Sequence, residues 1–535
     1  MQLSGTYSGG AVISVMPRSV REQNGLRPFQ KDILNALQSQ FKLIIVEAPV
    51  GAGKSYIIRK LIEDNRLSGF PIILTYPTKI LMNAQINALK KEFHDIRHWP
   101  DEPDGSGELT LFEYSTDALI RYLKAHPDII RLDKSEIIGQ VLRSHQFLSR
   151  KNIIITTPDV LHIIKKGFYR GSQRLEALLN KAIVIFDEFH LYTGLTNFAP
   201  LVEWLAGSIS HKIVFLSATP TITEDMQGIC QKYTTDKIEF KGSIGEESDT
   251  IFNYPLNLYI EECKYTRTDV MLEQLRKFLP ILQKPIAVIF DSVFRLRHLR
   301  PILEREFGKQ FNILEYSGMK KDNISFNEKT VILGTASIEV GVEMPIKSLI
   351  TEASYWTSAV QRLGRVGRFG RGEVVLLSRK RLTPFLGNRN SLTRDELEQD
   401  VLKNALKEVT GAMVSGEMFR GDSYPFIAID KKNNLLMPYT EAIFCMFDID
   451  DDFVQNWQKM NLHQKRELLK EYGLSHEEIE DILLRDRLFQ FWGVVKGQLK
   501  SEYENITVKH EDSNLIIYLS NSGKHYYFDS NGVLS

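Results

Sequence analysis

The feature that most constrains the fold is a recurrence of short, wholly apolar runs that each end in small, polar or charged residues. Runs that are apolar at every position suit strands covered on both faces by helices. Helix-like stretches such as KILMNAQINALKKEF lie between them, and this alternation predicts an α/β fold with parallel sheets. The runs form two series, which predicts two tandem lobes: 43–49, 71–77, 152–158, 182–188 and 212–220, then 286–292, 311–318, 330–337 and 373–378.

A polar segment near 221–250 separates the two series. We therefore expect a first lobe at 1–235 and a second lobe at 236–385. Within the first lobe, residues from about 94 to 150 include the acidic, glycine-rich DEPDGSGE, which predicts a solvated surface insertion. After about residue 385 the strand rhythm stops, and residues 386–535 are predicted to form a smaller C-terminal α/β accessory domain with a terminal hairpin, NLIIYLSNSGKHYYFD.

Charge and cysteine content narrow the functional classes. Lys and Arg together balance Asp and Glu at 67 each, so a nucleic-acid partner must be held by a local basic patch rather than by net charge. The three cysteines lie far apart in the sequence, which argues against a disulfide framework or a cysteine-based zinc site and for a reducing, intracellular setting. No apolar stretch approaches the roughly 18–20 residues of a membrane span, so we expect no membrane association.

The segment EAPVGAGKSY (47–56) follows the first apolar run and matches G-x-x-x-x-G-K-[ST], except that alanine replaces the first glycine. In open α/β sheets, ligands bind beyond the carboxyl ends of the strands, where a glycine-rich turn lets backbone N–H groups surround phosphates. Lys54 would reach the β/γ-phosphates, and the Ser55 hydroxyl would ligate Mg²⁺. Taken alone, the near-match leaves a chance glycine-rich turn open. The predicted nucleotide-binding residues are Gly51, Ala52, Gly53, Lys54 and Ser55.

The segment IVIFDEFHLY (183–192) drives a buried-looking strand into two adjacent carboxylates, Asp187 and Glu188. Adjacent carboxylates repel each other, and Lys54 with a bound Mg²⁺ would supply their counter-charge. An Asp at a strand end can hold Mg²⁺ opposite the phosphate-loop hydroxyl, and Glu188 can orient or deprotonate the attacking water. The alternative is a strand end whose acids face solvent, which suits an isolated Asp-Glu pair but not one accompanied by a Lys-Ser loop.

Arginines recur at every third position in SAVQRLGRVGRFGRG (358–372), at Arg362, Arg365 and Arg368. Phosphoryl transfer needs positive charge on the γ-phosphate in the transition state, and an arginine finger can contribute ~10³–10⁵ in rate. Arginines supplied by a second lobe would make hydrolysis conditional on lobe closure. The alternative, a basic solvated helix face, does not require the glycine spacing.

Several other predicted strands end in small hydroxyl residues and prolines, in TYPTK (75–79), TTPD (156–159), LSATP (216–220) and GTASIEVGVE (334–343). Hydroxyls and backbone amides suit contacts to a sugar–phosphate backbone that do not depend on base sequence. Singly, each segment is more often a strand-to-helix cap, but their common placement at strand exits favours a nucleic-acid interface. The predicted contacts are Thr75, Pro77, Thr78, Thr157, Asp159, Thr335 and Ser337.

Together these segments resemble a superfamily 2 DExH helicase with two RecA-like lobes. LRPFQ (26–30) resembles the adenine-reading element, APVGAGKS the helicase form of the phosphate loop, DEFH the DExH box, SATP the coupling motif and QRLGRVGR the arginine motif. The resemblance implies ATP and Mg²⁺ as cofactors, with Gln30 contacting adenine and Arg27 beside it in the nucleotide site. It also implies that Arg365 and Arg368 are the fingers. The residues implied to couple hydrolysis to strand movement are His190, Gln361, Ser217, Ala218 and Thr219.

Within this superfamily the chain is similar to the CRISPR-associated type I helicase, in the stand-alone form typical of subtype I-D systems. The DEFH box, the IEVGVEMP segment and the size of the tail support this resemblance. The typical member carries an N-terminal HD nuclease, but only 25 residues precede Leu26, so we expect none here. We interpret His94 of the single His-Asp pair, and His98, as surface histidines. Glu343 stands where helicases of this group often have Asp.

The resemblance implies that the substrate is single-stranded DNA displaced in an RNA-guided R-loop and reeled 3′ to 5′. Cutting would fall to a nuclease on another subunit of a CRISPR surveillance complex, to which this chain would be recruited as a monomer in the cytoplasm of a prokaryotic cell. Two alternatives stay open. One is a DExH RNA helicase or a DNA-repair helicase, because no residue pattern here separates RNA from DNA readers. The other is an ATP-gated clamp or scaffold that recruits a nuclease without processive unwinding.

Overall fold

The structure, a computed structural model, divides into two compact units. The phosphate-loop lobe comprises the described residues of Arg21–Lys241, and the arginine lobe comprises those of Met1–Val20, Gly242–Glu339 and Glu343–Ser535. Residues are described over 11–20, 22, 25–63, 70–77, 79–101, 109–126, 151–165, 182–191, 198–220, 222–241, 250–265, 267–291, 293–316, 322, 325–335, 338, 344–406, 416–418, 427–430, 435–438, 459–471, 476, 479, 483, 506–511, 514–519, 524–529 and 532–534.

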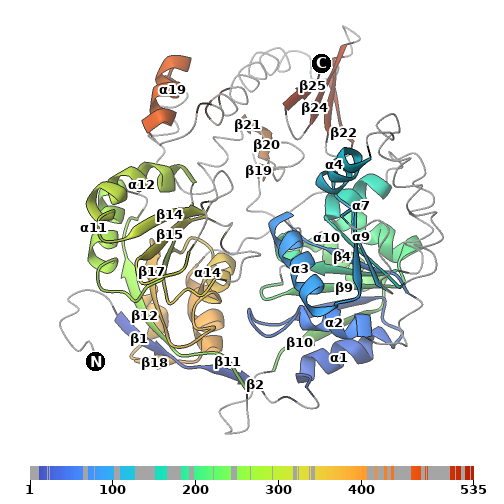
Figure 1. The fold of residues 1–535 in the computed structure, drawn as a ribbon, viewed down its shortest axis with the longest axis horizontal. Coiled ribbons are helices and arrows are strands. Elements are labelled where there is room, and N and C mark those ends of the chain that lie inside the picture. The colour runs from blue at the N-terminus through green and yellow to red at the C-terminus, as the bar shows by residue number, and fades with distance from the viewer. Residues whose placement is uncertain are drawn as a thin grey trace. The chain divides into compact units, whose positions relative to one another are not determined.

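The phosphate-loop lobe is built on an eight-stranded sheet in which every neighbouring pair of strands is parallel. Its strand order is β10 (Thr235–Glu239), β3 (Leu43–Glu47), β9 (Lys212–Ser217), β8 (Ile183–Asp187), β4 (Ile72–Thr75), β7 (Lys151–Thr156), β6 (Leu109–Glu113) and β5 (Ile96–Trp99). Its helices are α1 (Pro28–Leu37), α2 (Tyr56–Glu63), α3 (Lys79–Glu92), α4 (Thr116–Ala125), α7 (Pro158–Lys165), α9 (Phe198–Trp204) and α10 (Glu224–Lys232), with the short turns η3 (Phe189–Leu191) and η4 (Leu205–Ile209) (Figure 1).

The arginine lobe contains a second eight-stranded sheet, of which the first six strands are parallel. Its order is β14 (Asn312–Tyr316), β15 (Thr330–Gly334), β13 (Ile286–Ile289), β16 (Ser348–Glu352), β17 (Gly372–Ser378), β12 (Leu256–Glu262), β1 (Ala11–Val15) and β18 (Ser391–Leu392). Its helices are α11 (Thr268–Phe278), α12 (Val293–Phe307), α14 (Trp356–Leu363), α15 (Thr383–Leu386), η5 (Glu396–Leu402) and α16 (Lys403–Ala405). Two parallel α/β sheets confirm the predicted fold class of tandem RecA-like lobes.

Three features correct the predicted domain limits. Strand β1 pairs antiparallel with β12 of the arginine lobe, so the N-terminal residues do not belong to the first lobe, as 1–235 implied. The region from about 94 to 150, predicted as a surface insertion, contributes β5, β6 and α4 to the phosphate-loop lobe, although 102–108 and 127–150 lie outside the described residues. Strand β18 and η5, which begin the predicted tail domain, are integral to the arginine lobe because β18 pairs with β1.

Strands also form in the described parts of the tail. They make a three-stranded sheet of β19 (Gly416–Met418), β20 (Ile427–Asp430) and β21 (Leu435–Pro438), and a four-stranded sheet of β22 (Ile506–Glu511), β23 (Asn514–Leu519), β24 (Lys524–Asp529) and β25 (Gly532–Leu534). The antiparallel β23–β24 pair confirms the predicted hairpin, and α19 (Leu462–Glu471) lies between the two sheets in sequence. Among the described residues, no helix combines the length and apolar character needed to cross a bilayer.

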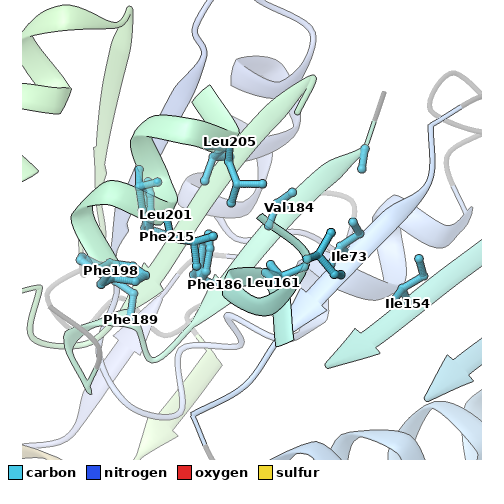
Figure 2. Close-up of a cluster of buried hydrophobic side chains, with 14 of the residues drawn as sticks. Ile73, Ile154, Leu161, Val184, Phe186, Phe189, Phe198, Leu201, Leu205 and Phe215 are labelled. Carbon is cyan, nitrogen blue, oxygen red and sulfur yellow. The ribbon is translucent and has the colours of Figure 1, made fainter. Parts of the chain in front are cut away.

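The core of the phosphate-loop lobe fixes the strand that carries the paired carboxylates. Phe186 stacks on Phe215 of β9 with ring centroids 5.5 Å apart, and Phe198 of α9 meets Phe186 edge-on at 5.3 Å. Figure 2 shows these rings gathered with Val184 and other buried residues between the strands and α9. Because β8 is buried along its whole length, the position of Asp187 at its end is set by packing.

Candidate nucleotide-binding and helicase site

The phosphate loop joins β3 to α2 at the carboxyl edge of the sheet, where the sequence predicts it. Two of its glycines, Gly51 at φ 85° and Gly53 at φ 84°, adopt left-handed backbone conformations that other residues rarely enter. A Cβ atom at Gly53 would also lie 3.0 Å from the Gln30 side-chain nitrogen. The sequence G-A-G is therefore required by the turn itself and by the close approach of α1.

Two residues at the start of α1 brace this loop from outside. The Gln30 Nε2 group donates to the Gly53 carbonyl at 2.8 Å, and the Arg27 Nη1 group donates to the Gly51 carbonyl at 3.2 Å. The Arg27 backbone N–H donates in turn to Gln30 Oε1 at 2.9 Å, so Gln30 also caps its own helix. The structure thus gives Gln30 and Arg27 a role in shaping the loop, and the adenine contact stays a prediction.

The phosphate-loop lysine lies beside the paired carboxylates. The Lys54 Nζ group donates to the Ala48 carbonyl at 3.0 Å and lies 3.8 Å from Glu188 Oε1. Both side chains are largely shielded from solvent, with 8% of Lys54 and 17% of Glu188 exposed. Lys54 therefore supplies one positive charge beside the two carboxylates, and Ser55, the next residue, is half-buried just before α2.

Asp187 and Glu188 differ in environment although they are adjacent. Asp187 is only 4% exposed, and burial raises its pKa to about 7, with repulsion from Glu188 adding to the rise and Lys54 opposing it. Glu188 has φ 48°, a left-handed conformation that costs a non-glycine residue free energy and is found at functional sites. Its backbone N–H donates to Asp187 Oδ1 at 3.0 Å, which orients the first carboxylate.

A chain of polar contacts leads from Glu188 to the end of β9. His190 Nδ1 lies 3.4 Å from Glu188 Oε2 and 2.8 Å from the Ser217 hydroxyl. The Thr219 backbone N–H donates to the same hydroxyl at 3.0 Å. Ala218 lies between them and is buried. The structure thus brings together the predicted coupling residues of this lobe, whereas the remaining one, Gln361, belongs to the arginine lobe.

The arginine segment begins in α14, and its first arginine is held inside the lobe. Arg362 Nη2 lies 2.7 Å from Asp291 Oδ1, and both side chains are 3% exposed. The Arg362 Nη1 group donates to the Glu352 carbonyl at 2.7 Å and to Thr351 Oγ1 at 3.2 Å. Sequence reasoning missed Asp291, although the run IAVIFDS places an acid at a strand exit, the same signal that identified Asp187.

The second and third arginines follow the end of α14 and are half-buried. The Arg368 Nε group donates to the Gly364 carbonyl at 2.8 Å, and Gly367 between them has φ 77°. Arg365 lies one residue beyond the Gly364 cap of the helix. Both therefore sit in a turn of defined geometry rather than on the basic helix face that was the alternative.

One predicted nucleic-acid contact is corrected by the structure. Thr75 is 0% exposed, and its hydroxyl donates to the Ile185 carbonyl of the neighbouring strand at 3.0 Å, so it ties β4 to β8 and cannot reach a polymer. Pro77, Thr157 and Thr335 are half-buried at strand exits. Asp159 lies in the first turn of α7, with only its backbone described, and Thr78, Ser337 and Glu343 lie outside the described residues.

The interpretation of His98 as a surface histidine is also corrected. His98 is buried, with Nδ1 2.7 Å from Asp101 Oδ2 and Nε2 3.4 Å from Glu113 Oε2. It is on β5, which was assigned to a solvated insertion, and this explains the error. His94 is exposed, as expected.

Comparison with known proteins shows what this part of the chain is similar to. Residues 27–226 match the family model of the DEAD/DEAH box helicases, a span that includes both the phosphate loop and the DEFH box. These residues are therefore similar to a DEAD/DEAH box helicase domain. The match supports the predicted enzyme class, an ATP-hydrolysing helicase, and the predicted use of ATP.

Two curated proteins are similar to the chain. A CRISPR-associated nuclease/helicase Cas3 candidate of Methanocaldococcus jannaschii is 25% identical over 64% of this chain and 46% of its own length. A CRISPR-associated helicase Cas3 of Thermoproteus tenax is 24% identical over 54% of this chain and 53% of its own. The chain spans about half the length of the curated relatives it matches. Among solved structures, the DUF1998 helicase MrfA bound to DNA aligns at 18% identity with a TM-score of 0.47, covering 72% of this chain and 56% of that one.

Proposed function

We propose that the chain is an ATP-dependent single-stranded-DNA translocase and helicase. The observation that carries this proposal is the continuous set of contacts from Lys54 through Glu188 and His190 to Ser217. A side chain suited to bind phosphate is thereby connected to the end of β9, where the coupling motif begins. Such a connection is what a motor needs in order to convert a change at the nucleotide into a change at its polymer-binding surface.

In this proposal each residue of the site in the phosphate-loop lobe has a separate role in ATP hydrolysis. Lys54 and the loop N–H groups neutralise and orient the phosphates, and Glu188 orients the attacking water and accepts its proton. Asp187 and the Ser55 hydroxyl fit Mg²⁺, because the ion prefers oxygen ligands and the raised pKa of Asp187 reports a buried carboxylate short of positive charge. When bound, Mg²⁺ would neutralise charge on the β- and γ-phosphate oxygens.

Arg365 and Arg368 act as the fingers that stabilise charge on the γ-phosphate in the transition state. Because they belong to the other lobe, hydrolysis depends on closure of the two lobes. Gln361 is assigned to the coupling set together with His190. Pro77, Thr157 and Thr335, which lie at strand exits and are partly accessible, contact the sugar–phosphate backbone.

The assignment to CRISPR interference is supported by the names of the two curated relatives, and the assignment to DNA follows from the resemblance to CRISPR-associated type I helicases. In that setting the chain reels the displaced strand 3′ to 5′ after recruitment as a monomer to a CRISPR surveillance complex. A nuclease on another subunit then cuts the exposed strand. The stand-alone form of the subtype I-D helicase is the family form proposed.

The test is the steady-state ATPase rate of the full chain without polymer, with single-stranded DNA and with matched single-stranded RNA. Salt is held fixed, because phosphate contacts are strongly salt-dependent. Stimulation by DNA, lost in Glu188→Gln, supports the proposal. Stimulation by RNA alone would keep the ATP site and overturn the DNA assignment in favour of an RNA helicase.

An ATP-gated clamp gives a different pattern in the same assay. Its ATPase would respond to neither polymer alone, and Glu188→Gln would retain ATP-dependent DNA binding and nuclease recruitment. Strand movement by the wild-type chain that is lost in Glu188→Gln would exclude the clamp.

A further inference from the structure

A buried arginine outside every motif of the site holds the turn that carries the two fingers. Arg394, which precedes η5, is 2% exposed. Its Nη1 group donates to the Leu363 carbonyl at 3.3 Å, and its Nη2 group donates to the Val366 carbonyl at 3.2 Å. These two carbonyls flank Arg365 in the sequence. The guanidinium therefore spans the end of α14 and the turn that follows it.

The same turn is pinned from a second direction. The Arg394 Nη2 group also donates to the Tyr254 carbonyl at 3.4 Å, and the Tyr254 backbone N–H donates to the Gly367 carbonyl at 2.6 Å. A Cβ atom at Gly367 would lie 2.8 Å from Arg394 Nη2 and 2.9 Å from the Tyr254 carbonyl. Arg394 and the start of β12 thus fit closely around a glycine at φ 77°.

Tyr254 directly follows one of two paired strands that lie close in the sequence to points where the chain passes between its compact units. Strand β11 (Thr250–Asn253) pairs antiparallel with β2 (Arg18–Val20), and two of the unit boundaries fall after Val20 and after Lys241. We call β2 and β11 the linking strands. We call the turn after α14 that carries Arg365 and Arg368 the finger turn. Contacts with Tyr254 therefore connect the finger turn to the linking strands within one lobe.

The second linking strand reaches the same arginine through η5. The Arg18 Nη2 group donates to Glu398 Oε2 at 3.1 Å and also pairs with Asp395. Burial lowers the pKa of Arg394 to about 10, attraction by Glu398 opposes this fall, and repulsion by Arg18 and Arg368 adds to it. Arg394 consequently stays charged at neutral pH, and Glu398 lies where it attracts both arginines.

We infer that Arg394 is a positioning residue, which holds the finger turn in register with the linking strands. The inference rests on the proposed function and extends it to a residue beyond the arginine motif. A planar guanidinium with several fixed donors can bridge three carbonyls, whereas a lysine ammonium is a compact charge on a flexible stem. No direct contact of Arg394 with the nucleotide is required.

The experiment uses Arg394→Lys in the full chain, with DNA-stimulated ATPase as the readout. We expect kcat to fall roughly 10- to 100-fold, because small misplacements of catalytic groups have effects of this size, while KM for ATP changes by no more than about twofold. Arg389→Lys is the matched control: Arg389 also donates to backbone carbonyls, of Leu386 and Phe385, but at the end of α15, and its kcat should equal that of the wild type.

A combined variant separates positioning from a general structural effect. If Arg394 acts through the fingers, adding Arg394→Lys to the variant that carries both Arg365→Ala and Arg368→Ala should cause no further loss of turnover. Multiplicative losses would overturn the inference, as would a normal kcat in Arg394→Lys while Arg365→Ala is impaired. Normal turnover in both single variants would instead overturn the finger role in the proposed function.

If Arg394→Lys shows no cooperative unfolding transition, and therefore is not properly folded, Glu398→Gln provides the test. It removes the charge that attracts Arg394 and Arg18 but keeps the side-chain shape. A smaller fall in kcat at unchanged KM supports the inference. Wild-type kcat in the folded Glu398→Gln variant overturns it.

Discussion

Removing Asp291 from its buried pair with Arg362 should strongly destabilise the arginine lobe, because it leaves an uncompensated charge in the interior. Both side chains are 3% exposed at a separation of 2.7 Å, so Asp291→Ala leaves a guanidinium in the interior without its carboxylate partner, although its contacts with the Thr351 hydroxyl and the Glu352 carbonyl remain. Breaking one partner of a buried ion pair costs about 3–5 kcal/mol. Asp291→Asn keeps an acceptor and should cost less, roughly 1.5–3 kcal/mol.

Hydrogen exchange followed by mass spectrometry is the suitable assay, because a chain with two compact units need not unfold in one step. The opening free energy of peptides that cover β13, β16 and α14 should fall in Asp291→Ala, while peptides from the phosphate-loop lobe stay unchanged. Asp269→Ala is the matched control, since Asp269 pairs with Arg267 at 2.6 Å but the side chains are 65% and 61% exposed. Equal exchange in the two variants would refute the assignment of stability to burial of the Asp291 pair.

Three further changes test individual contacts. Lys54→Ala should abolish ATP hydrolysis, because it removes the cation beside Glu188; turnover at the wild-type rate would contradict the site assignment. His190→Ala should retain hydrolysis but lose strand unwinding, since it cuts the connection between Glu188 and Ser217, and parallel loss of both activities would argue against a coupling role. Thr75→Val should cost about 1 kcal/mol of stability and leave DNA affinity at fixed salt unchanged. Thr157→Ala, by contrast, should weaken DNA affinity. Reduced DNA affinity in Thr75→Val would contradict the burial of the Thr75 hydroxyl.

The parallel strands at the centre of each sheet were predictable because burial on both faces leaves an unmistakable apolar run. The nucleotide site was predictable for a related reason, because its residues follow those strands at the carboxyl edge. Asp187 illustrates both: the run before it is buried throughout, and the acid itself stands where a parallel sheet places its ligands.

Strands away from the centres of the sheets were harder to predict from the sequence. In β12 buried and partly exposed residues alternate, and β5 carries Arg97 and His98, so neither is a wholly apolar run. Strand β1 is short, and its assignment depends on pairing with β12, in which Ala11 lies opposite Ile260, 249 positions away in the sequence. Long-range pairing of this kind has no local signature, which is why the N-terminus was assigned to the other lobe.

Thr75 shows a further limit of reasoning from strand exits. A hydroxyl at the end of a buried strand can point along the edge towards a ligand or sideways to the neighbouring backbone, and the same sequence, TYPTK, is compatible with both. The outcome is decided by the strand beside it, because the Ile185 carbonyl of β8 offers an acceptor at 3.0 Å. Which strand lies beside β4 depends on the strand order in the sheet, and the alternation of strands and helices along the sequence does not determine that order.

The residues that hold α14 and the finger turn were missed for the same reason, because they are distant in the sequence. The turn itself is legible, since its glycine and arginine spacing is local, but Asp291 and Arg394 lie 71 and 32 positions from Arg362 in the sequence and reach it through the fold. Their side chains bind backbone carbonyls or a buried guanidinium rather than a ligand, so the residues around them carry no motif. If Arg365 and Arg368 are the proposed fingers, they act only in a fixed position, and the contacts of Arg394 hold the turn that carries them.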